Sequence, residues 1–240
     1  MFSFLKKENN LLANPLLVDI HSHLLAGIDD GAKSWDESIA MLKTLNSIGY
    51  KKFITTPHIM SDLYRNDPII IKSKLDELQT ILKNDGILLE IEAAAEYYLD
   101  ESLMKKVEQS EELMTFGKKH LLFETSFFSE PLQIKDFIFQ ATLKGYQLVL
   151  AHPERYSYMT LAKAEDLRNR GVQFQLNILS ILGFYSKPVQ KMAYQLIDNQ
   201  WIELLGTDCH NMVQANYLQQ NQNNKYLQKA LQLPLLNNQL

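Results

Sequence analysis

The sequence predicts one α/β domain in which parallel strands alternate with helices and close into a TIM-like barrel. Short apolar runs of strand length recur along the chain, segments with helical spacing separate them, and most runs end at a histidine or a carboxylate. With 240 residues, of which 46% are hydrophobic and 22% charged, the chain has an ordinary globular composition and is long enough to bury a large core.

The first half of the chain alternates regularly between the two kinds of segment. The expected elements are strand 16–20, helix 35–48, strand 52–56, helix 68–84, strand 87–95 and helix 100–108. Ser34 and Glu37 form a capping-box pattern at the start of the first helix, and Gly49 is a natural end for it. The run 52–56 is β-branched, which favours a strand.

The second half continues the same alternation. The expected elements are strand 121–123, helix 131–144, strand 147–151, helix 162–170, strand 172–176, helix 189–199 and strand 201–205. Glu130-Pro131 favours a helix start with proline in the first turn, and Gly145 and Gly171 end helices. The glutamine- and asparagine-rich segment after Asn211 predicts a final helix and a loose end.

No linker or change in composition divides these seven units. Near-continuous apolar strands are typical of parallel sheets that are buried on both faces. Seven units closed into a barrel give a relative of the eight-fold barrel with one unit missing. We therefore expect a single domain over 1–240, with a metal-binding core at 16–210 and a C-terminal helix and tail at 211–240.

Charge and cysteine content exclude several classes of protein. A net charge of −4 without a basic run argues against nucleic-acid binding. The single cysteine, Cys209, excludes an internal disulfide framework and favours a reducing compartment. Neither Met1–Asn10 nor the following segment 11–20 is a signal sequence or a membrane span. We expect a soluble cytoplasmic protein without membrane insertion.

The first strand ends in the motif His21-Ser22-His23, which Asp29-Asp30-Gly31 follows. Successive side chains of an extended chain alternate in direction, so His21 and His23 point the same way. Two adjacent imidazoles can chelate a metal, and Asp29 or Asp30 can add a carboxylate oxygen. Taken alone, the histidines could equally cap a strand or bond a backbone carbonyl.

The remaining strand ends favour a metal centre. They deliver further metal-competent side chains at His58, Glu96, Glu124, His152, Asp208 and His210. The spacing is 28 residues from Glu96 to Glu124 and 28 residues from Glu124 to His152. From His152 to Asp208 it is 56 residues, which is twice that unit. In barrels of this kind the carboxyl ends of the strands form the active site. Imidazoles and carboxylates that converge there predict a multinuclear zinc, manganese or iron centre.

Together these motifs resemble the PHP (polymerase and histidinol phosphatase) family. The matching segments are H-S-H with D-D-G, T-P-H, E-Y-Y, F-E, A-H-P-E-R-Y and T-D-C-H, from Val18 to His210. Within that family they resemble the metal-dependent bacterial tyrosine-protein phosphatases of capsule and exopolysaccharide export. The resemblance implies a distorted (β/α)7 barrel and a phosphotyrosine protein substrate, specifically a bacterial tyrosine kinase of polysaccharide export.

The resemblance also implies three divalent metal ions, with manganese as the first choice and iron, zinc, cobalt or magnesium as alternatives. The first ion would be held by His21, His23, Glu96 and Asp208. Glu96 would bridge to the second, which Glu124 and His152 complete. The third would be held by Asp30, His58 and His210.

Two arginines are candidates for binding the substrate phosphate. The resemblance gives this role to Arg155, whose planar guanidinium suits it; the alternative is a surface salt bridge with Glu154 or Asp166. The capsule phosphatases carry a further arginine after the final histidine motif, but 211–224 contains none. Arg65 is the candidate replacement.

The predicted chemistry is hydrolysis of a phosphomonoester by a metal-bound hydroxide, without a protein nucleophile. A cysteine mechanism would need an arginine six residues after Cys209, where Ala215 stands. The rival hypotheses are a small-metabolite phosphatase such as histidinol phosphatase, a nuclease-like phosphoesterase, and a non-catalytic scaffold. The sequence makes no prediction of oligomeric state.

Overall fold

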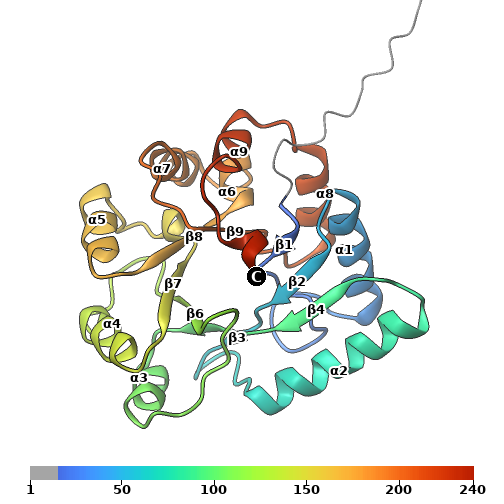
Figure 1. The fold of residues 1–240 in the computed structure, drawn as a ribbon, viewed down its shortest axis with the longest axis horizontal. Helices are drawn as coiled ribbons and strands as arrows, with labels where there is room; N and C mark the ends of the chain where they lie inside the picture. The colour runs from blue at the N-terminus through green and yellow to red at the C-terminus, as the bar shows by residue number, and fades with distance from the viewer. Residues whose placement is uncertain (1–15) are drawn as a thin grey trace, which may run out of the picture.

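The computed structural model describes residues 16–240, so the expectations for residues 1–15 lie outside it. Within that range the strands are β1 (Val18–Asp19), β2 (Lys52–Thr55), β3 (His58–Ile59), β4 (Glu90–Ala93), β5 (Glu96–Tyr98), β6 (His120–Glu124), β7 (Gln147–Ala151), β8 (Gln173–Asn177) and β9 (Leu204–Gly206). All strand pairs are parallel. They curve around a common centre, and helices cover their outer side (Figure 1).

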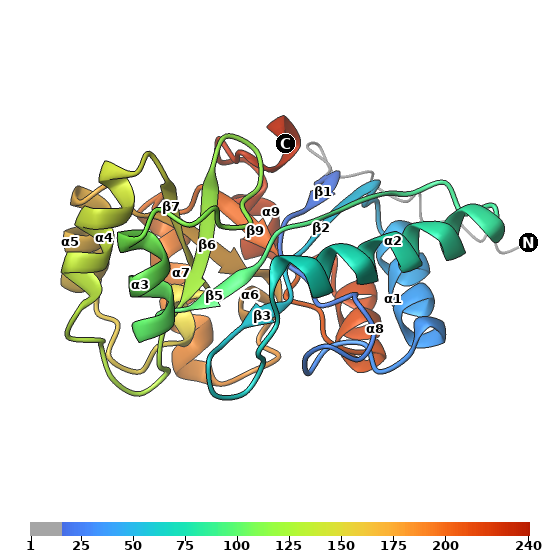
Figure 2. The same ribbon diagram turned by 90° about the horizontal axis from the view of Figure 1, so that it is seen from below.

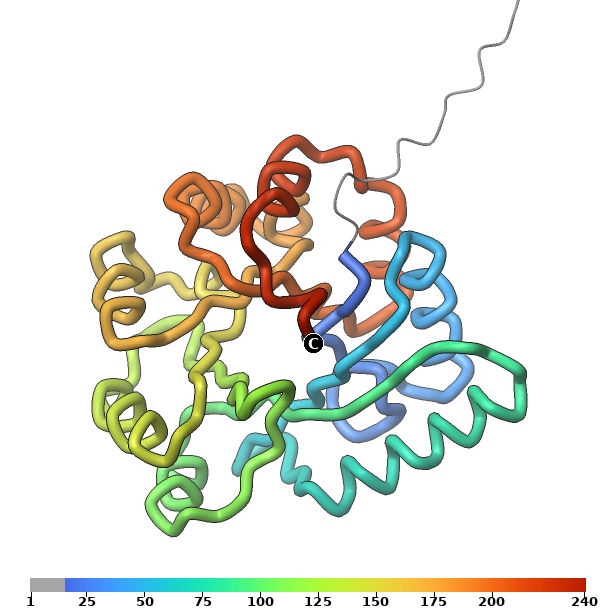
Figure 3. Tube along the Cα trace, in the orientation of Figure 1, coloured from blue at the N-terminus to red at the C-terminus, as the bar shows by residue number. Residues whose placement is uncertain are grey.

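The strands form two hydrogen-bonded sheets, with the orders β1-β2-β4 and β3-β5-β6-β7-β8-β9. The second strand ends at Thr55, close to its predicted end before Pro57; an unpredicted strand, β3, follows this proline, which has no N–H to donate. The predicted third strand is observed as β4, which ends at Ala93, and an unpredicted strand, β5, follows Ala94 and Ala95. Backbone bonds from Ala94 N to Thr55 O and from Glu96 N to Pro57 O join the two breaks, so the division between the two sheets falls at the same level in both segments. The chain curves around one centre through both sheets (Figure 3).

The continuation of the last strand meets that of the first. Asp208 N donates to His21 O at 2.7 Å, and His23 N donates to Cys209 O at 3.0 Å. Ser22 and Cys209 form an isolated parallel bridge. These bonds bring the two histidines of the first motif beside the last one.

The helices lie mostly where the sequence predicts them. They are α1 (Trp35–Ser47), α2 (Pro68–Asn84), α3 (Glu101–Glu108), α4 (Ile134–Leu143), α5 (Leu161–Asn169), α6 (Ile178–Leu182), α7 (Lys187–Asp198), α8 (Met212–Gln220) and α9 (Lys225–Ala230), with 3₁₀ turns η1 (Pro153–Arg155) and η2 (Asn237–Gln239). The Ser34 side chain accepts from Glu37 N, as in the predicted capping box. The returning bond differs, because Glu37 Oε2 accepts from the N–H of Lys33 and not from that of Ser34.

Three expectations about helices are wrong. Helix α4 begins at Ile134 and not at Pro131, because the first turn of that segment is bound only by Ile134 N to Pro131 O. Helix α6 and the turn η1 are absent from the prediction, since each is too short to show helical periodicity. The tail has two helices and a 3₁₀ turn where one helix and a loose end were expected.

The C-terminal turn η2 is anchored by the fully buried Asn237. Its Nδ2 donates to Val18 O at 3.0 Å and to Leu205 O at 2.7 Å, and its Oδ1 accepts from Leu205 N at 3.0 Å. Leu236 and Leu240 pack against the apolar cluster inside the curled sheet. The C-terminus therefore lies at the centre of the strands (Figure 1), on the side opposite the loop after β3 (Figure 2).

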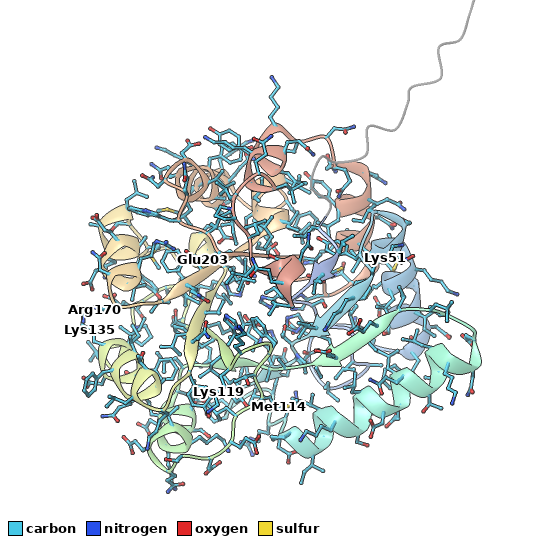
Figure 4. All side chains as sticks on the ribbon, in the orientation of Figure 1. Lys51, Met114, Lys119, Lys135, Arg170 and Glu203 are labelled. Atoms are coloured by element: carbon cyan, nitrogen blue, oxygen red, sulfur yellow. The ribbon has the colours of Figure 1, made fainter. Side chains whose placement is uncertain are left out.

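Side chains of one strand alternate between two apolar layers. On β7, Leu148 and Leu150 belong to the large cluster that includes the helices, whereas Val149 and Ala151 belong to the small inner cluster. This double burial explains the near-continuous apolar runs of the sequence. Figure 4 shows side chains filling the space between strands and helices. Over 16–240, no helix has the length and apolar character that a membrane crossing requires.

Candidate metal centre

The nine side chains predicted as metal ligands lie together at the carboxyl ends of the strands. Five imidazoles and four carboxylates converge there: His21, His23, Asp30, His58, Glu96, Glu124, His152, Asp208 and His210. They belong to separate βα units and meet because the carboxyl ends of parallel strands lie at the same edge of the sheet. All are buried except the half-buried His210 and the exposed Asp30.

The most enclosed group consists of His21, His23, Glu96 and Asp208. The two Nε2 atoms face each other at 3.3 Å. Glu96 Oε2 lies 3.1 Å from His21 Nε2 and 3.5 Å from His23 Nε2, and Asp208 Oδ1 lies 3.3 and 3.4 Å from the same atoms. Two imidazole nitrogens and two carboxylate oxygens thus point at one small volume, as the ligands of a chelated cation do.

A second group lies around the other oxygen of Glu96. His152 Nε2 is 2.9 Å from Glu96 Oε1 and 4.0 Å from Glu124 Oε2. His58 Nδ1 also enters this group, at 3.0 Å from Glu124 Oε1 and 3.2 Å from Glu96 Oε2. Glu96 therefore faces both groups, which is the geometry of a bridging carboxylate.

The third group lies nearer the surface. Asp30 Oδ1 is 3.4 Å from His58 Nε2 and 3.5 Å from His210 Nε2. The rings of His23 and His210 stack with centroids 3.9 Å apart. His58 is thus in contact with two groups, through Nδ1 and through Nε2.

The chemistry of these groups fits divalent cations. His58 Nδ1 is buried and close to two carboxylates, yet makes no hydrogen bond of acceptable geometry within the described chain. Burial lowers the pKa of His58, but Glu96, Asp30 and Glu124 together outweigh this and raise that pKa to about 10. Burial raises the pKa of Glu96, but the imidazoles of His21, His58 and His152 together outweigh this and hold that pKa well below its usual range. Protons on the imidazoles balance the carboxylates here, a role that bound cations take over when imidazoles ligate them.

Other side chains orient the imidazoles. Asp29 Oδ2 accepts from His23 Nδ1 at 2.8 Å, and Gln175 Oε1 accepts from His21 Nδ1 at 2.7 Å. Of the two aspartates left open by the sequence, Asp29 therefore faces the back of His23, and Asp30 faces the other groups. Gln175 and its strand neighbour Asn177 were not predicted. Their signal is the alternation Q-F-Q-L-N in β8, which places amides on the face where other strands carry apolar residues.

Arg155 lies beside the metal groups, in η1. Its Nη1 donates to Asp208 Oδ2 at 2.7 Å, and its guanidinium lies between the rings of Phe127 and Tyr185, at 4.7 and 4.6 Å from their centroids. The alternative salt bridge to Asp166 does not form, because Asp166 pairs with Arg170. Arg155 is thus held rigidly with its charge toward the cavity.

Arg65 is not brought into this arrangement. Its Nε donates to Ser61 O at 2.9 Å within the loop after β3. The same loop places Tyr64 over His58, with nearly parallel rings 5.4 Å apart. The aromatic neighbour of Arg65, and not Arg65 itself, lines the cavity described next.

A cavity of about 440 Å³ opens above the metal groups. Its lining has a charged part, which we call the base, and a largely aromatic and apolar part, which we call the wall and mouth. The base consists of Asp30, His58, Glu124, His152, Arg155, Asp208 and His210; the wall and mouth consist of Met60, Leu63, Tyr64, Tyr98, Ser126, Phe127 and Phe128. Leu63 and Phe128 are 72% and 85% exposed. The cavity can therefore hold an anion at its base and an aromatic group above it.

Comparison with known proteins shows similarity to one family and to its named tyrosine-protein phosphatases. The family model described as "Capsular polysaccharide synthesis, CpsB/CapC" matches residues 17–232. Tyrosine-protein phosphatase YwqE of Bacillus subtilis is 27% identical over 203 residues, covering 84% of this chain and 80% of the relative. Tyrosine-protein phosphatase CpsB of Streptococcus pneumoniae is 26% identical over 212 residues, covering 85% and 87%.

A solved structure is similar as well. It is described as "Crystal structures of YwqE from Bacillus subtilis and CpsB from Streptococcus pneumoniae, unique metal-dependent tyrosine phosphatases". Its TM-score to this chain is 0.78 and its sequence identity is 26%, and the match covers 89% of this chain and 84% of that one. The fold and these similarities define the class of the protein, that of the metal-dependent tyrosine-protein phosphatases. The chain belongs to the CpsB/CapC family of capsular polysaccharide synthesis.

Proposed function

We propose that this protein is a metal-dependent protein-tyrosine phosphatase. The observation that carries the proposal is the convergence of five imidazoles and four carboxylates with Arg155 at the base of one aromatic-lined cavity. The curled parallel sheet supports our further proposal of a single distorted seven-unit barrel, closed where Ser22 meets Cys209.

We assign three metal positions to the three groups. The first is held by His21, His23, Glu96 and Asp208; the second by Glu96, Glu124 and His152; the third by Asp30, His58 and His210. Manganese is our first choice, since mixed imidazole and carboxylate ligands suit it, as they suit iron and zinc. When bound, such ions neutralise phosphoryl oxygens and lower the pKa of water toward neutrality.

The protein's own groups bind and orient the substrate. Arg155 keeps free N–H groups for the phosphoryl oxygens, because the described contacts engage only its Nη1, which donates to Asp208 Oδ2. We place the phenyl ring of a phosphotyrosine against the aromatic wall to which Tyr98 and Phe127 belong, with the largely exposed Leu63 and Phe128 in contact with the flanking polypeptide. This aromatic wall favours an aryl phosphate over the alkyl phosphate of histidinol phosphate.

A covalent cysteine mechanism does not fit the site. Cys209 is fully buried, and burial raises the pKa of its thiol, so it is neither accessible nor ionised. The hydrolysis therefore uses no cysteine nucleophile. We further propose a cytoplasmic location and a tyrosine kinase of polysaccharide export as the substrate.

The test is a substrate panel assayed with metal-free protein and after addition of Mn²⁺. We expect hydrolysis of a phosphotyrosine peptide only with Mn²⁺, at a kcat/KM at least tenfold above those for histidinol phosphate and a phosphorylated oligonucleotide. Turnover of histidinol phosphate alone would overturn the substrate assignment. Full metal loading without turnover of any substrate would indicate a scaffold.

A further inference from the structure

Among the described strands whose carboxyl ends meet at the metal groups, β8 contributes no proposed metal ligand. Its inward face carries Gln173, Gln175 and Asn177, and the last two are fully buried. Burying an amide is costly unless its polar atoms are bonded. Two neutral amides beneath a cluster of charged groups therefore call for an explanation.

Gln175 fixes the proton of His21. Its Oε1 lies 2.7 Å from His21 Nδ1, so Nδ1 carries the hydrogen and donates it. In the neutral ring the lone pair then resides on Nε2, the atom that faces Glu96 and Asp208. An acceptor that bonds the far nitrogen of the ring in this way selects the tautomer that can bind a metal.

The neighbouring strand leaves space for this contact. A Cβ atom at Gly206 would lie 2.6 Å from Gln175 Nε2 and 2.7 Å from His21 Cβ. Glycine is thus required at this position of β9 so that the Gln175 side chain can reach across to His21. The same Oε1 also accepts from His152 N at 3.4 Å, which ties the amide to the strand on its other side.

Asn177 performs the corresponding task for Asp208. Its Nδ2 donates to Asp208 Oδ2 at 2.6 Å, and its Oδ1 accepts from Leu179 N at 2.9 Å as the cap of α6. Its backbone N–H donates to Glu154 Oε1 at 3.1 Å. With Oδ2 engaged by Asn177 and Arg155, Oδ1 is the oxygen that remains for the metal group.

We propose that Gln175 and Asn177 are positioning residues that hold His21 and Asp208 in their metal-binding orientation. The inference rests on the proposed metal centre. It assigns a role to β8, which brings no ligand of its own: its side-chain bonds from Gln175 to His21 and from Asn177 to Asp208 pre-organise the most enclosed metal position before any ion enters.

The experiment titrates metal-free protein with Mn²⁺ alone and measures bound metal by calorimetry and electron paramagnetic resonance. Gln175→Met keeps the size and removes the acceptor, and we expect about 10- to 100-fold weaker binding, the usual effect of losing such a partner. Gln175→Glu restores an acceptor oxygen and should bind Mn²⁺ at least as tightly as the wild type. Asn177→Ser keeps the helix cap but cannot reach Asp208, and should also weaken binding.

The matched control is Gln173→Met, two residues earlier on the same face of β8, where no proposed ligand is bonded by the side chain. We expect wild-type Mn²⁺ affinity for it and for all variants a melting temperature, measured without metal, close to the wild type. Unchanged affinity in Gln175→Met, failure of Gln175→Glu to restore it, or an equal loss in Gln173→Met would each overturn the inference. If Gln175→Met does not fold, the comparison of Gln175→Glu and Asn177→Ser with the control still decides. Absence of Mn²⁺ binding by the wild type would instead refute the metal centre itself.

Discussion

The guanidinium of Arg155 and the carboxylate of Asp208 are joined by a 2.7 Å hydrogen bond between Nη1 and Oδ2. The other oxygen of Asp208 lies 3.3 Å from His21 Nε2. One buried carboxylate therefore connects the candidate phosphate-binding group to the most enclosed metal group. This link makes the position of the phosphate and the position of the metal depend on each other.

Replacing Arg155 tests that link. We expect Arg155→Ala to raise KM for a phosphotyrosine peptide by about 10- to 100-fold, since charge-assisted hydrogen bonds contribute about 1.5–3 kcal/mol. Arg155→Lys should recover little, because an ammonium cannot reproduce the fork. Steady-state kinetics at saturating Mn²⁺ give the measurement. The control is Arg170→Ala, at the outer edge of the molecule in Figure 4 and paired only with Asp166 in the described contacts; unchanged KM in Arg155→Ala would remove Arg155 from the site.

The bridging arrangement around Glu96 leads to a second prediction. His152→Ala removes the imidazole 2.9 Å from Glu96 Oε1. We expect turnover to fall by at least about a thousandfold, because the residues of such a site act as a unit. Far-ultraviolet circular dichroism should remain that of the wild type, and native mass spectrometry should detect fewer bound ions. Full activity with the wild-type ion count would contradict the assigned ligand role.

The pH dependence of the metal-free protein follows from the imidazole pKa values. Carboxylates raise the pKa of His58 to about 10, above the unfolded value of about 6.5. A raised imidazole pKa adds stability that is complete below pH 6.5 and is lost as the pH rises toward 10. We therefore expect the melting temperature of metal-free protein to fall over this range. Bound Mn²⁺ should reduce that fall, because the ligating imidazoles are then neutral at every pH in the range; a flat profile without metal would refute the assignment.

The mouth of the cavity should distinguish peptides from small aryl phosphates. Leu63 and Phe128 lie at the mouth and are largely exposed, a placement typical of a docking surface. For Phe128→Ser and Leu63→Ser we expect the ratio of kcat/KM for a phosphotyrosine peptide to that for p-nitrophenyl phosphate to fall by about tenfold. Such a factor corresponds to roughly 1.4 kcal/mol, less than one buried apolar side chain contributes.

The control for the cavity mouth is Leu132→Ser. Leu132 is fully exposed and does not line the described cavity, so its replacement should leave both substrates unaffected. Equal losses for the peptide and for p-nitrophenyl phosphate in Phe128→Ser would show that Phe128 does not contact the polypeptide.

The C-terminal anchor predicts a stability effect remote from the site. Asn237→Ala removes three hydrogen bonds and leaves buried groups of Val18 and Leu205 without them. We expect a loss of about 2–4 kcal/mol in the free energy of unfolding, since each buried unsatisfied group costs about 1–3 kcal/mol. Water that enters the space left by the amide satisfies some of these groups, so the full sum is not reached. Urea denaturation measures it. Asn238→Ala, on an exposed neighbour, should cost less than about 1 kcal/mol; equal losses would contradict the anchoring role.

Much of the fold follows from local pattern. Strands such as β7 and helices such as α2 lie where apolar periodicity and capping residues predict them, because both signals act over a few neighbouring residues. The short strands β3 and β5 are not predicted, because two or three residues show no periodicity and these strands form by pairing with segments far along the chain, His58 with Glu96 and Glu96 with Leu122. The ordered C-terminus was missed because Asn237 finds its partners more than thirty positions away, at Leu205 and Val18.

The side chains that stand at the strand ends can be identified from the amino-acid sequence, since that information is local: a run of apolar residues and the polar residue that ends it. How those side chains pair depends on the three-dimensional fold. The bonds of Gln175 to His21 and of Arg155 to Asp208 span 154 and 53 residues. The physical reason is that hydrogen bonds and ion pairs act over a few ångströms, so their partners exist only once parallel strands have brought distant segments to one edge.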